Sequence, residues 1–167
     1  MVGMDWIGAA LTQGWVWPAY LYLAGVGLAA SWIDQTTGRI PNRLVLPSYP
    51  IVLGLLVWAA ALGHDATALV RAALGGAGLF LVYLMLTWVA AGQLGMGDVK
   101  LAGLLGMGLA HVGWTALAVG ALAGFALGGA AGLALLAQGK GARQAFPFGP
   151  WMCLGALLGG LFTLWTG

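Results

Sequence analysis

The sequence predicts an all-α, polytopic membrane protein with about six transmembrane helices. Of its 167 residues, 62% are hydrophobic and only 6% are charged, and the mean hydropathy is +0.97. A soluble domain typically carries about 25% charged residues, so this chain cannot cover a surface that faces water. Thirty glycines indicate close packing between membrane helices. We expect one domain, embedded in the lipid bilayer, over residues 1–167.

Six apolar segments are candidates for the spanning helices, since a span needs roughly 20 mainly apolar residues. They are Trp15–Ile33, Leu44–Leu62, Leu69–Ala91, Val99–His111, Gly113–Ala137 and Trp151–Trp165. The fourth is too short to cross the full bilayer, so we expect it to be tilted or to begin in a protein-lined cavity. Residues 1–14 are expected to form a short interfacial segment, Asp65 to cap the third helix, and Gly92–Gly97 to form a glycine-rich hairpin.

A stripe of small residues follows the fifth segment. Gly120, Gly124, Gly128 and Gly132 recur every four residues and therefore share one helix face. Such faces let two helix backbones approach closely. We expect this stripe to pack against another helix of the same chain, and a homodimer through the glycine-rich helices is the alternative.

The distribution of basic residues predicts the orientation. With six spans, the first, third and fifth loops share one side, and they hold Arg39, Arg43, Lys100, Lys140 and Arg143. The other side has only Arg71. Since cytoplasmic loops are enriched in Lys and Arg, we expect these three loops in the cytoplasm and both termini outside. The net charge of +2 comes with no basic patch, which argues against nucleic-acid binding.

Two aspartates, Asp34 and Asp98, are the candidates for chemistry. Each lies at the edge of a long apolar stretch, where an ionisable side chain is costly and indicates function. Charge bias and helix parity place both on the cytoplasmic side. Two carboxyl groups that meet cannot both ionise easily, so one keeps its proton. The ionised group could take a proton from water while the other hydrogen-bonds a peptide carbonyl, with no metal, cofactor or covalent intermediate.

Each aspartate also has a purely structural interpretation. Asp98 could be the N-cap of the fourth helix. Asp34 lies at the C-terminal end of the first helix, where the dipole disfavours an anion, and its structural alternative is an ion pair with Arg39, Arg43 or Lys100. The second functional hypothesis is therefore a non-catalytic small transporter or scaffold, in which the aspartates bind a cation or pair with arginine.

The sequence does not supply the residues that other kinds of catalytic site need. His64 and His111 are expected at the opposite membrane face from the aspartates, as interfacial residues. Neither Ser31 nor Ser48, the only serines, has a histidine on its side, which argues against a nucleophilic serine. Cys153 is the only cysteine, so an intrachain disulfide and a cysteine-cluster zinc site are excluded. We expect Cys153 to be a small buried packing residue.

Three short elements carry a family resemblance. Gly95-Met96-Gly97-Asp98 resembles the GxGD signature of the type IV prepilin peptidases. Asp34, with Ile40-Pro41-Asn42 downstream, resembles the first catalytic aspartate of that family and its Ile-Pro-Asn. The segment Phe146-Pro147-Phe148-Gly149-Pro150 resembles the element before its last helix. The three occur in the family's order and cover nearly the whole membrane region.

The resemblance implies an aspartic endopeptidase with Asp34 and Asp98 as its catalytic pair. Its substrates would be prepilin or pseudopilin-like membrane proteins, whose short basic leaders are cut, usually after a glycine, at the cytoplasmic face of the bacterial inner membrane. The resemblance also places a set of residues near the substrate: Gly95, Gly97, Lys100, Arg39, Pro41, Asn42, Pro147 and Gly149. Because about fourteen residues precede the first span and Cys153 is the only cysteine, we expect a short form without the methyltransferase domain of the longer enzymes.

Overall fold

The computed structural model describes residues 14–63, 65–89, 94–138 and 147–166. Within these ranges the chain forms six α-helices and no strand. The helices are α2 (Trp17–Thr37), α3 (Asn42–Gly63), α4 (Ala66–Val89), α5 (Met96–Val112), α6 (Trp114–Ala137) and α7 (Gly149–Thr166). The predicted all-α polytopic fold is confirmed, and each apolar segment corresponds to one helix. The expected interfacial segment was residues 1–14, and all of it except Gly14 lies outside the described ranges.

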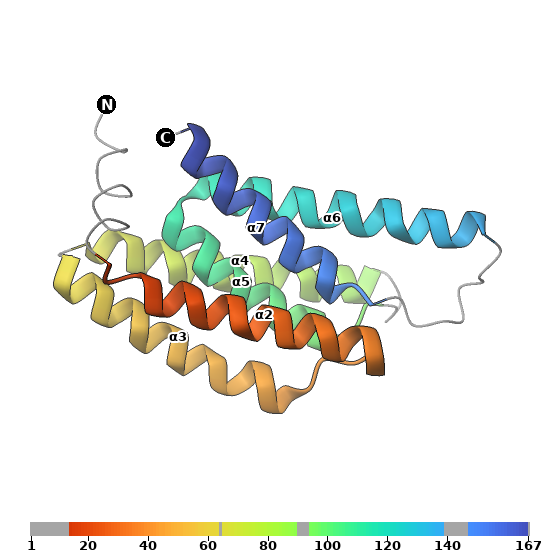
Figure 1. Ribbon diagram of the computed structural model, residues 1–167, viewed down its shortest axis with the longest axis horizontal. Coiled ribbons are helices and arrows are strands. Elements are labelled where there is room, and N and C mark those ends of the chain that lie inside the picture. The colour runs from red at the N-terminus through yellow and green to blue at the C-terminus, as the bar shows by residue number, and fades with distance from the viewer. Residues whose placement is uncertain (1–13, 64, 90–93, 139–146, 167) are drawn as a thin grey trace.

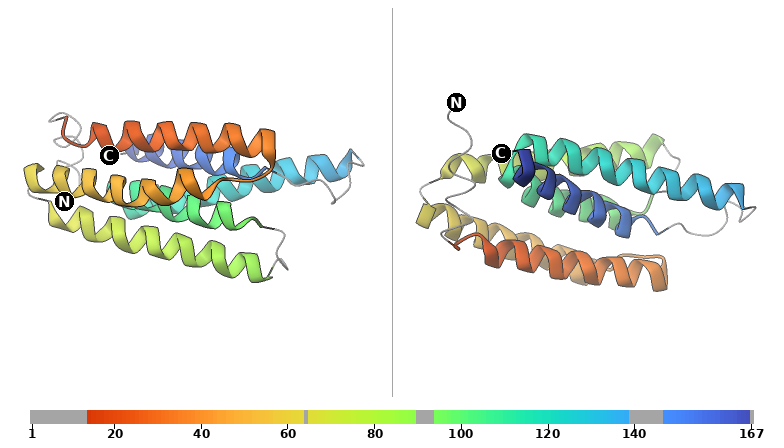
Figure 2. Two further views of the ribbon diagram at one scale, coloured as in Figure 1. Left: turned by 90° about the horizontal axis from the view of Figure 1, so that it is seen from below. Right: turned by 45° about the horizontal axis from the view of Figure 1, so that its top comes forward.

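Successive helices run in alternating directions along one bundle (Figure 1). As a result, the last turns of α2, α4 and α6 lie at one end, together with the first turns of α3, α5 and α7. The two further views show the same arrangement, with the C-terminal part of α6 extending beyond the other helices (Figure 2). Asp34 lies in the last turn of α2 and Asp98 in the first turn of α5. The fold therefore brings both aspartates to the same end.

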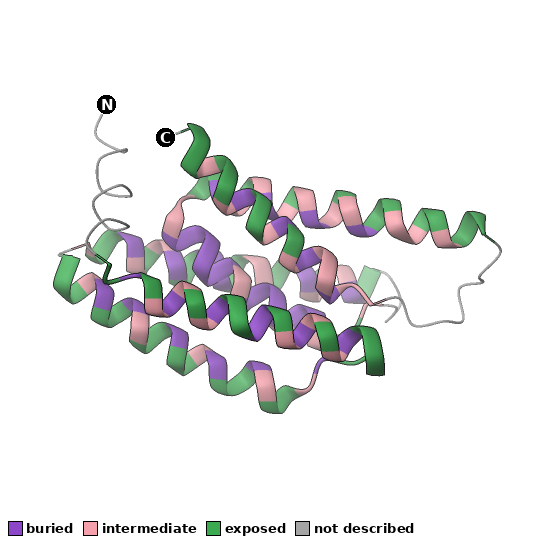
Figure 3. Cartoon of the chain, in the orientation of Figure 1, coloured by how far each residue is buried: buried purple, intermediate pink, exposed green. Residues whose placement is uncertain are grey.

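The short helix α5 is the centre of the bundle. Twelve of its 17 residues are buried, and it packs against all five of the other helices (Figure 3). Four helices, α3, α4, α6 and α7, are long and apolar enough to cross a membrane. Since protein surrounds α5, it has no need of the length that a lipid-facing span requires. It begins at Met96, so Met96 and Gly97 are helical and the predicted hairpin is wrong at these two positions.

Glycines allow α4 and α5 to approach closely. A Cβ atom added at Gly75 would lie 3.2 Å from the carbonyl oxygen of Gly106, and one added at Gly76 would lie 3.0 Å from that of Gly103. A Cβ atom at Gly106 would in turn lie 2.8 Å from the Gly75 oxygen. The two backbones are thus in direct contact, as small residues permit. This contact fixes the helix that carries Asp98.

The glycine stripe of α6 packs against α7. Gly120, Gly124 and Gly128 are buried, and a Cβ atom added at Gly155 of α7 would collide with the backbone of α6 at Gly120 and Gly124. The predicted packing within the chain is confirmed for these three positions. The fourth member, Gly132, has open space beside it.

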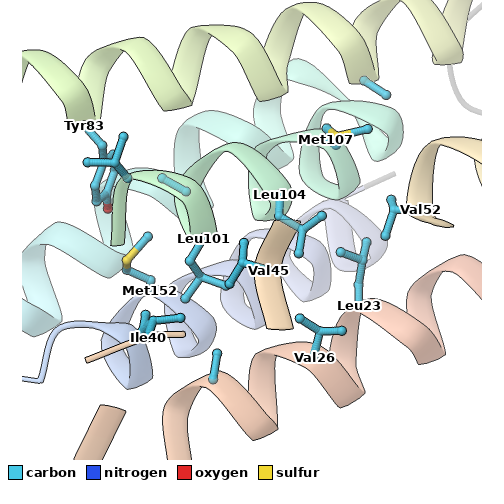
Figure 4. Close-up of a cluster of buried hydrophobic side chains, with 14 of the residues drawn as sticks. Leu23, Val26, Ile40, Val45, Val52, Tyr83, Leu101, Leu104, Met107 and Met152 are labelled. Atoms are coloured by element: carbon cyan, nitrogen blue, oxygen red, sulfur yellow. The ribbon is translucent and has the colours of Figure 1, made fainter. Parts of the chain in front are cut away.

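A continuous apolar core joins the helices and reaches the end that carries the aspartates (Figure 4). Its labelled members in that view are Leu23, Val26, Ile40, Val45, Val52, Tyr83, Leu101, Leu104, Met107 and Met152. Ile40 comes from the connection between α2 and α3, while the others lie on helices. The core therefore holds that connection in place beside the first turn of α5.

Two sequence predictions about single residues need correction. His111 is not interfacial, because only 4% of it is exposed and its Nδ1 lies 2.8 Å from the hydroxyl of Tyr20. The reason is that α5 ends inside the bundle, where Arg71 donates hydrogen bonds to the carbonyls of Ala110 and His111. Cys153 is half-buried rather than buried, with Sγ 3.5 Å from the carbonyl oxygen of Gly27. His64 lies outside the described residues.

Candidate active site

Asp34 stands where α2 ends. The backbone of Gly38 is left-handed, with φ 66°, and its N–H donates to the carbonyl oxygen of Asp34 at 2.8 Å. This arrangement ends a helix at little cost because glycine has no Cβ atom to oppose positive φ. Only 5% of Asp34 is exposed. Its carboxylate thus points into the bundle, although the residue lies three positions from the end of the helix.

The carboxylate of Asp34 meets the start of a distant helix. The N–H of Gly149, the first residue of α7, donates to Oδ2 of Asp34 at 2.9 Å. A helix N-terminus carries unpaired N–H groups and partial positive charge, which stabilise an anion. The N-terminus of α7 therefore offsets the unfavourable position of Asp34 near the C-terminus of its own helix.

Asp98 occupies the third position of α5. The N-cap residue is Gly95, with extended backbone at φ −68° and ψ 141°, so the interpretation of Asp98 as an N-cap is wrong. Only 8% of Asp98 is exposed, and Oδ1 is buried with no hydrogen-bond partner among the described residues. A buried carboxyl oxygen without a partner is costly, more so if the group is ionised. Oδ1 of Asp98 is therefore available to a water molecule or to a group of the substrate.

Ile40 lies between the helix starts that flank the two carboxyl groups. A Cβ atom added at Gly97 would lie 2.8 Å from Cβ of Ile40, and one added at Gly149 would lie 3.3 Å from Cδ1 of Ile40. Gly97 is therefore required for this close approach, and a side chain at Gly149 would crowd Ile40. Asp34 and Asp98 are near enough to interact electrostatically. The structure brings together four of the predicted site residues: Asp34, Asp98, Gly97 and Gly149.

Lys100 and Asn42 cross-link α3 and α5 at the edge of the site. Nζ of Lys100 donates to Oδ1 of Asn42 at 2.7 Å, and the hydroxyl of Tyr49 donates to the Lys100 carbonyl at 2.7 Å. Lys100 therefore positions the first turns of these helices. Across the described ranges, no ion pair joins Asp34 to Arg39, Arg43 or Lys100, so the ion-pair alternative for Asp34 is wrong.

The remaining predicted site residues lie around the pair, and of these Gly95 interacts with Asp98 through its backbone N–H. The carbonyl of Pro41 accepts hydrogen bonds from the N–H groups of Leu44 and Val45, so it starts α3. Arg39 is exposed, and Pro147 is half-buried just before α7. Gly95 is exposed beside Oδ2 of Asp98, where an added Cβ atom would lie at 3.1 Å.

An aromatic cluster that the sequence did not indicate borders Asp98. Tyr83 of α4 stacks on Phe125 of α6 with ring centroids 4.8 Å apart, and Phe148 lies 6.2 Å from Tyr83 and 6.0 Å from Phe125. Tyr83 is 2% exposed and interacts electrostatically with Asp98. In the sequence, Tyr83 stands out only because it places a hydroxyl group within an apolar helix. Phe148 stands inside the resemblance element, but nothing in the sequence shows what its ring contacts.

Comparisons with known proteins agree with these features. The model of the type IV leader peptidase family matches residues 21–164. The chain is 32% identical over 165 residues to the prepilin leader peptidase/N-methyltransferase of Aeromonas salmonicida, covering 95% of this chain and 53% of that protein. The protein of the same name from Aeromonas hydrophila is 30% identical over 168 residues, with the same coverage. This chain thus spans about half the length of these relatives.

A shorter relative matches over nearly its full length. Leader peptidase HopD of Salmonella typhimurium is 31% identical over 153 residues, which are 86% of this chain and 92% of that protein. No solved structure gives a significant match. The family model covers most of the chain, and the region includes both buried aspartates and the helix starts around them. The chain therefore belongs to the type IV leader peptidase family.

Proposed function

We propose that this protein is an aspartic endopeptidase that removes the leader from prepilin-like substrates, with Asp34 and Asp98 as the catalytic pair. The observation that carries the proposal is that two buried carboxyl groups from distant parts of the chain lie at one end of the bundle, near enough to interact electrostatically. One oxygen of Asp98 is without a partner among the described residues. Family membership and the names of the relatives support the same activity.

The pair can hydrolyse a peptide bond by acid–base catalysis. One carboxylate takes a proton from a water molecule as the water oxygen bonds to the peptide carbonyl carbon. The other, protonated, carboxyl group gives its proton to the carbonyl oxygen. As the resulting tetrahedral diol collapses and the C–N bond breaks, the first carboxyl group gives the proton it took to the leaving nitrogen. A hydroxyl of the diol gives its proton to the second carboxylate, which restores the pair. Positioned acid–base groups of this kind contribute about 10² to 10⁴ in rate.

The membrane setting supports a prepilin-like substrate and a site on the cytoplasmic side. Family and apolar helices make this a bacterial membrane protein. The basic residues Arg39, Arg43 and Lys100 lie at the end of the bundle that holds the aspartates, which supports a cytoplasmic site by the positive-inside rule. The relatives from Aeromonas are named as prepilin leader peptidases. A prepilin inserted in the inner membrane would present its leader at that face.

Cleavage of a prepilin by the purified protein tests the proposal. The substrate is a prepilin whose leader ends in glycine ahead of its hydrophobic helix, and the new N-terminus is identified by mass spectrometry. Asp34→Asn and Asp98→Asn should each reduce the cleavage rate at least about 100-fold, because each removes one proton-transfer group.

Asp65→Asn is the matched control, since it makes the same change at the opposite end of the bundle. Asparagine caps a helix about as well as aspartate, so this variant should keep the wild-type rate. Near wild-type cleavage by either Asp34→Asn or Asp98→Asn would refute the catalytic pair. If no prepilin is cut by the wild type, and cation binding depends on the aspartates, the transporter or scaffold hypothesis gains.

A further inference from the structure

We propose that Phe148 is a positioning residue for Asp34. The ring of Phe148 packs against Gly128 and thereby holds the Gly149 N–H in hydrogen-bonding position at the Asp34 carboxylate. This hydrogen bond makes Asp34 the proton-accepting member of the pair. This inference rests on the proposed function and adds to it a division of roles between the two aspartates. It also adds a device, remote from the reacting atoms, that maintains this division.

The surroundings of the two carboxyl groups differ. Asp34 accepts the backbone N–H of Gly149 at the start of α7, and a hydrogen bond of this kind favours the ionised form of a carboxyl group. Asp98 also lies in the first turn of a helix, but its Oδ1 is buried with no partner in the described part of the chain. The neutral acid tolerates such an oxygen better than the carboxylate does. Asp34 is thus the base and Asp98 the acid.

The groups that face the pair are consistent with this assignment. Asp34 interacts electrostatically with Asp98 of α5 and with the thiol of Cys153 on α7. Asp98 in addition faces the phenol of Tyr83 on α4. The ammonium group of Lys100 on α5 donates a hydrogen bond to Asn42 rather than to either aspartate. Asp98 also has a backbone donor, the N–H of Gly95. The feature that distinguishes the two carboxyl groups is therefore Oδ1 of Asp98, which is buried without a partner among the described residues, while the Gly149 N–H stabilises the ionised form of Asp34.

Phe148 fixes the position of that N–H. It immediately precedes Gly149, and its carbonyl accepts hydrogen bonds from the N–H groups of Trp151 and Met152 in the first turn of α7. Its ring lies against the rings of Tyr83 and Phe125. It also lies against Gly128, where an added Cβ atom would collide with the ring. The absence of a side chain at Gly128 therefore sets how far the start of α7 can approach Asp34.

The glycine stripe supplies a matched pair of variants. Gly128 and Gly132 are one turn apart on the same face of α6, and alanine at either has the same intrinsic effect on a helix. A Cβ atom at Gly128 meets Phe148, whereas a Cβ atom at Gly132 meets nothing within 4 Å. Differences between Gly128→Ala and Gly132→Ala therefore report on contact with Phe148.

Steady-state cleavage of a prepilin by the full-length protein tests the inference. Gly128→Ala should lower kcat about tenfold and leave KM within about twofold, because a small displacement of a reacting group is costly while substrate contacts are unchanged. The acidic limb of its pH–kcat profile should move to higher pH, since Asp34 loses part of its N–H donor. Gly132→Ala should match the wild type in all three readouts.

A double variant separates the ring contact from general damage to the bundle. Leucine has no ring to collide with the methyl group that Gly128→Ala introduces, so Gly128→Ala combined with Phe148→Leu should have a higher kcat than Gly128→Ala alone. Additive losses in the double variant, or Gly128→Ala behaving like Gly132→Ala, would overturn the inference. If Gly128→Ala does not fold, Phe148→Leu alone decides: an unchanged kcat and acidic limb would also overturn it. An inactive wild type would instead count against the proposed function.

Discussion

At the scale of single residues, the same side chain serves different ends according to what surrounds it. Asp65 and Asp34 both accept a backbone N–H at the start of a helix. Asp65 caps the helix that follows it, as predicted, through Ala68 N–H at 3.0 Å and the hydroxyl of Thr67 at 2.6 Å. Asp34 instead binds the start of a helix from the far end of the chain. The first contact is readable from the local sequence, and the second requires the fold.

The cap at Asp65 predicts a stability that depends on pH. Burial raises its pKa, but hydrogen bonds from Thr67 and Ala68 and the charge of Arg71 outweigh burial, so the pKa lies below its ordinary value. A lowered pKa means that the carboxylate stabilises the fold at neutral pH and that this contribution is lost as the pH falls through the folded-state value.

Asp65→Ala should therefore lower the free energy of unfolding by about 1 kcal/mol at pH 7, the usual value of an N-cap. The difference from wild type should shrink in acid. Thermal unfolding in detergent micelles at neutral and acidic pH measures it. Asp65→Asn should lose less than Asp65→Ala at pH 7, because asparagine keeps the cap but not the charge. An equal loss from Asp65→Ala at both pH values would contradict the role of the charge.

At the scale of helices, glycine faces decide which helices pack as close pairs. In α4–α5 and in α6–α7 the backbones touch at glycine positions from both partners. The first pair carries Asp98 and the second carries Gly149, so each close pair holds one side of the candidate site. α2, which bears Asp34, packs against both α5 and α7. Loosening either glycine contact would therefore move a group that faces Asp34.

Two glycines of α7 test this directly. A Cβ atom at Gly155 would collide with the α6 backbone, whereas one at Gly160 meets nothing within 4 Å. Gly155→Ala should destabilise the protein by about 1–3 kcal/mol, the usual cost of overpacking, and Gly160→Ala should be neutral or slightly stabilising. Unfolding by denaturant in micelles compares them. Equal stabilities for the two variants would show that α6 and α7 do not depend on this contact.

Hydropathy and charge were enough to predict the helices and to single out Asp34 and Asp98. Exposing a polar group to lipid is costly, and this cost depends on residue types that can be read directly from each segment. The burial of His111 was not predicted, because hydropathy does not reveal that α5 ends inside the bundle. The N–H of Gly149 on Asp34 and the ring of Phe148 on Gly128 were also missed. Both depend on how α7 packs, although Pro150 after Gly149 is a local sign of a helix start.

At the scale of the whole molecule, the basic residues that the structure describes are distributed unevenly between the two ends. Arg39, Arg43 and Lys100 lie at the end that holds the aspartates, and Arg71 lies at the other. Arg71 is also bound to the last carbonyls of α5. The alternating direction of the helices therefore agrees with the loop parity from which the cytoplasmic orientation was inferred.

Labelling of single cysteines tests that orientation. Gln35 and Ala66 are exposed at opposite ends of the bundle. In a background that carries Cys153→Ala, Ala66→Cys should react with a membrane-impermeant maleimide added to intact cells. Gln35→Cys should react only after the inner membrane is opened. Labelling of Gln35→Cys in intact cells would place the aspartates on the outer side and contradict the proposed orientation.

The composition of the enclosed helix α5 has a consequence for the movement of protons. Asp98 lies near one end of this helix and His111 near the other. Every side chain from Leu101 to Ala110 is apolar or hydrogen, and all but Leu105 are buried. Along α5 there is thus no relay of ionisable groups by which a proton could pass from Asp98 to His111. An acid–base pair at one end of this helix therefore does not turn the helix itself into a proton path.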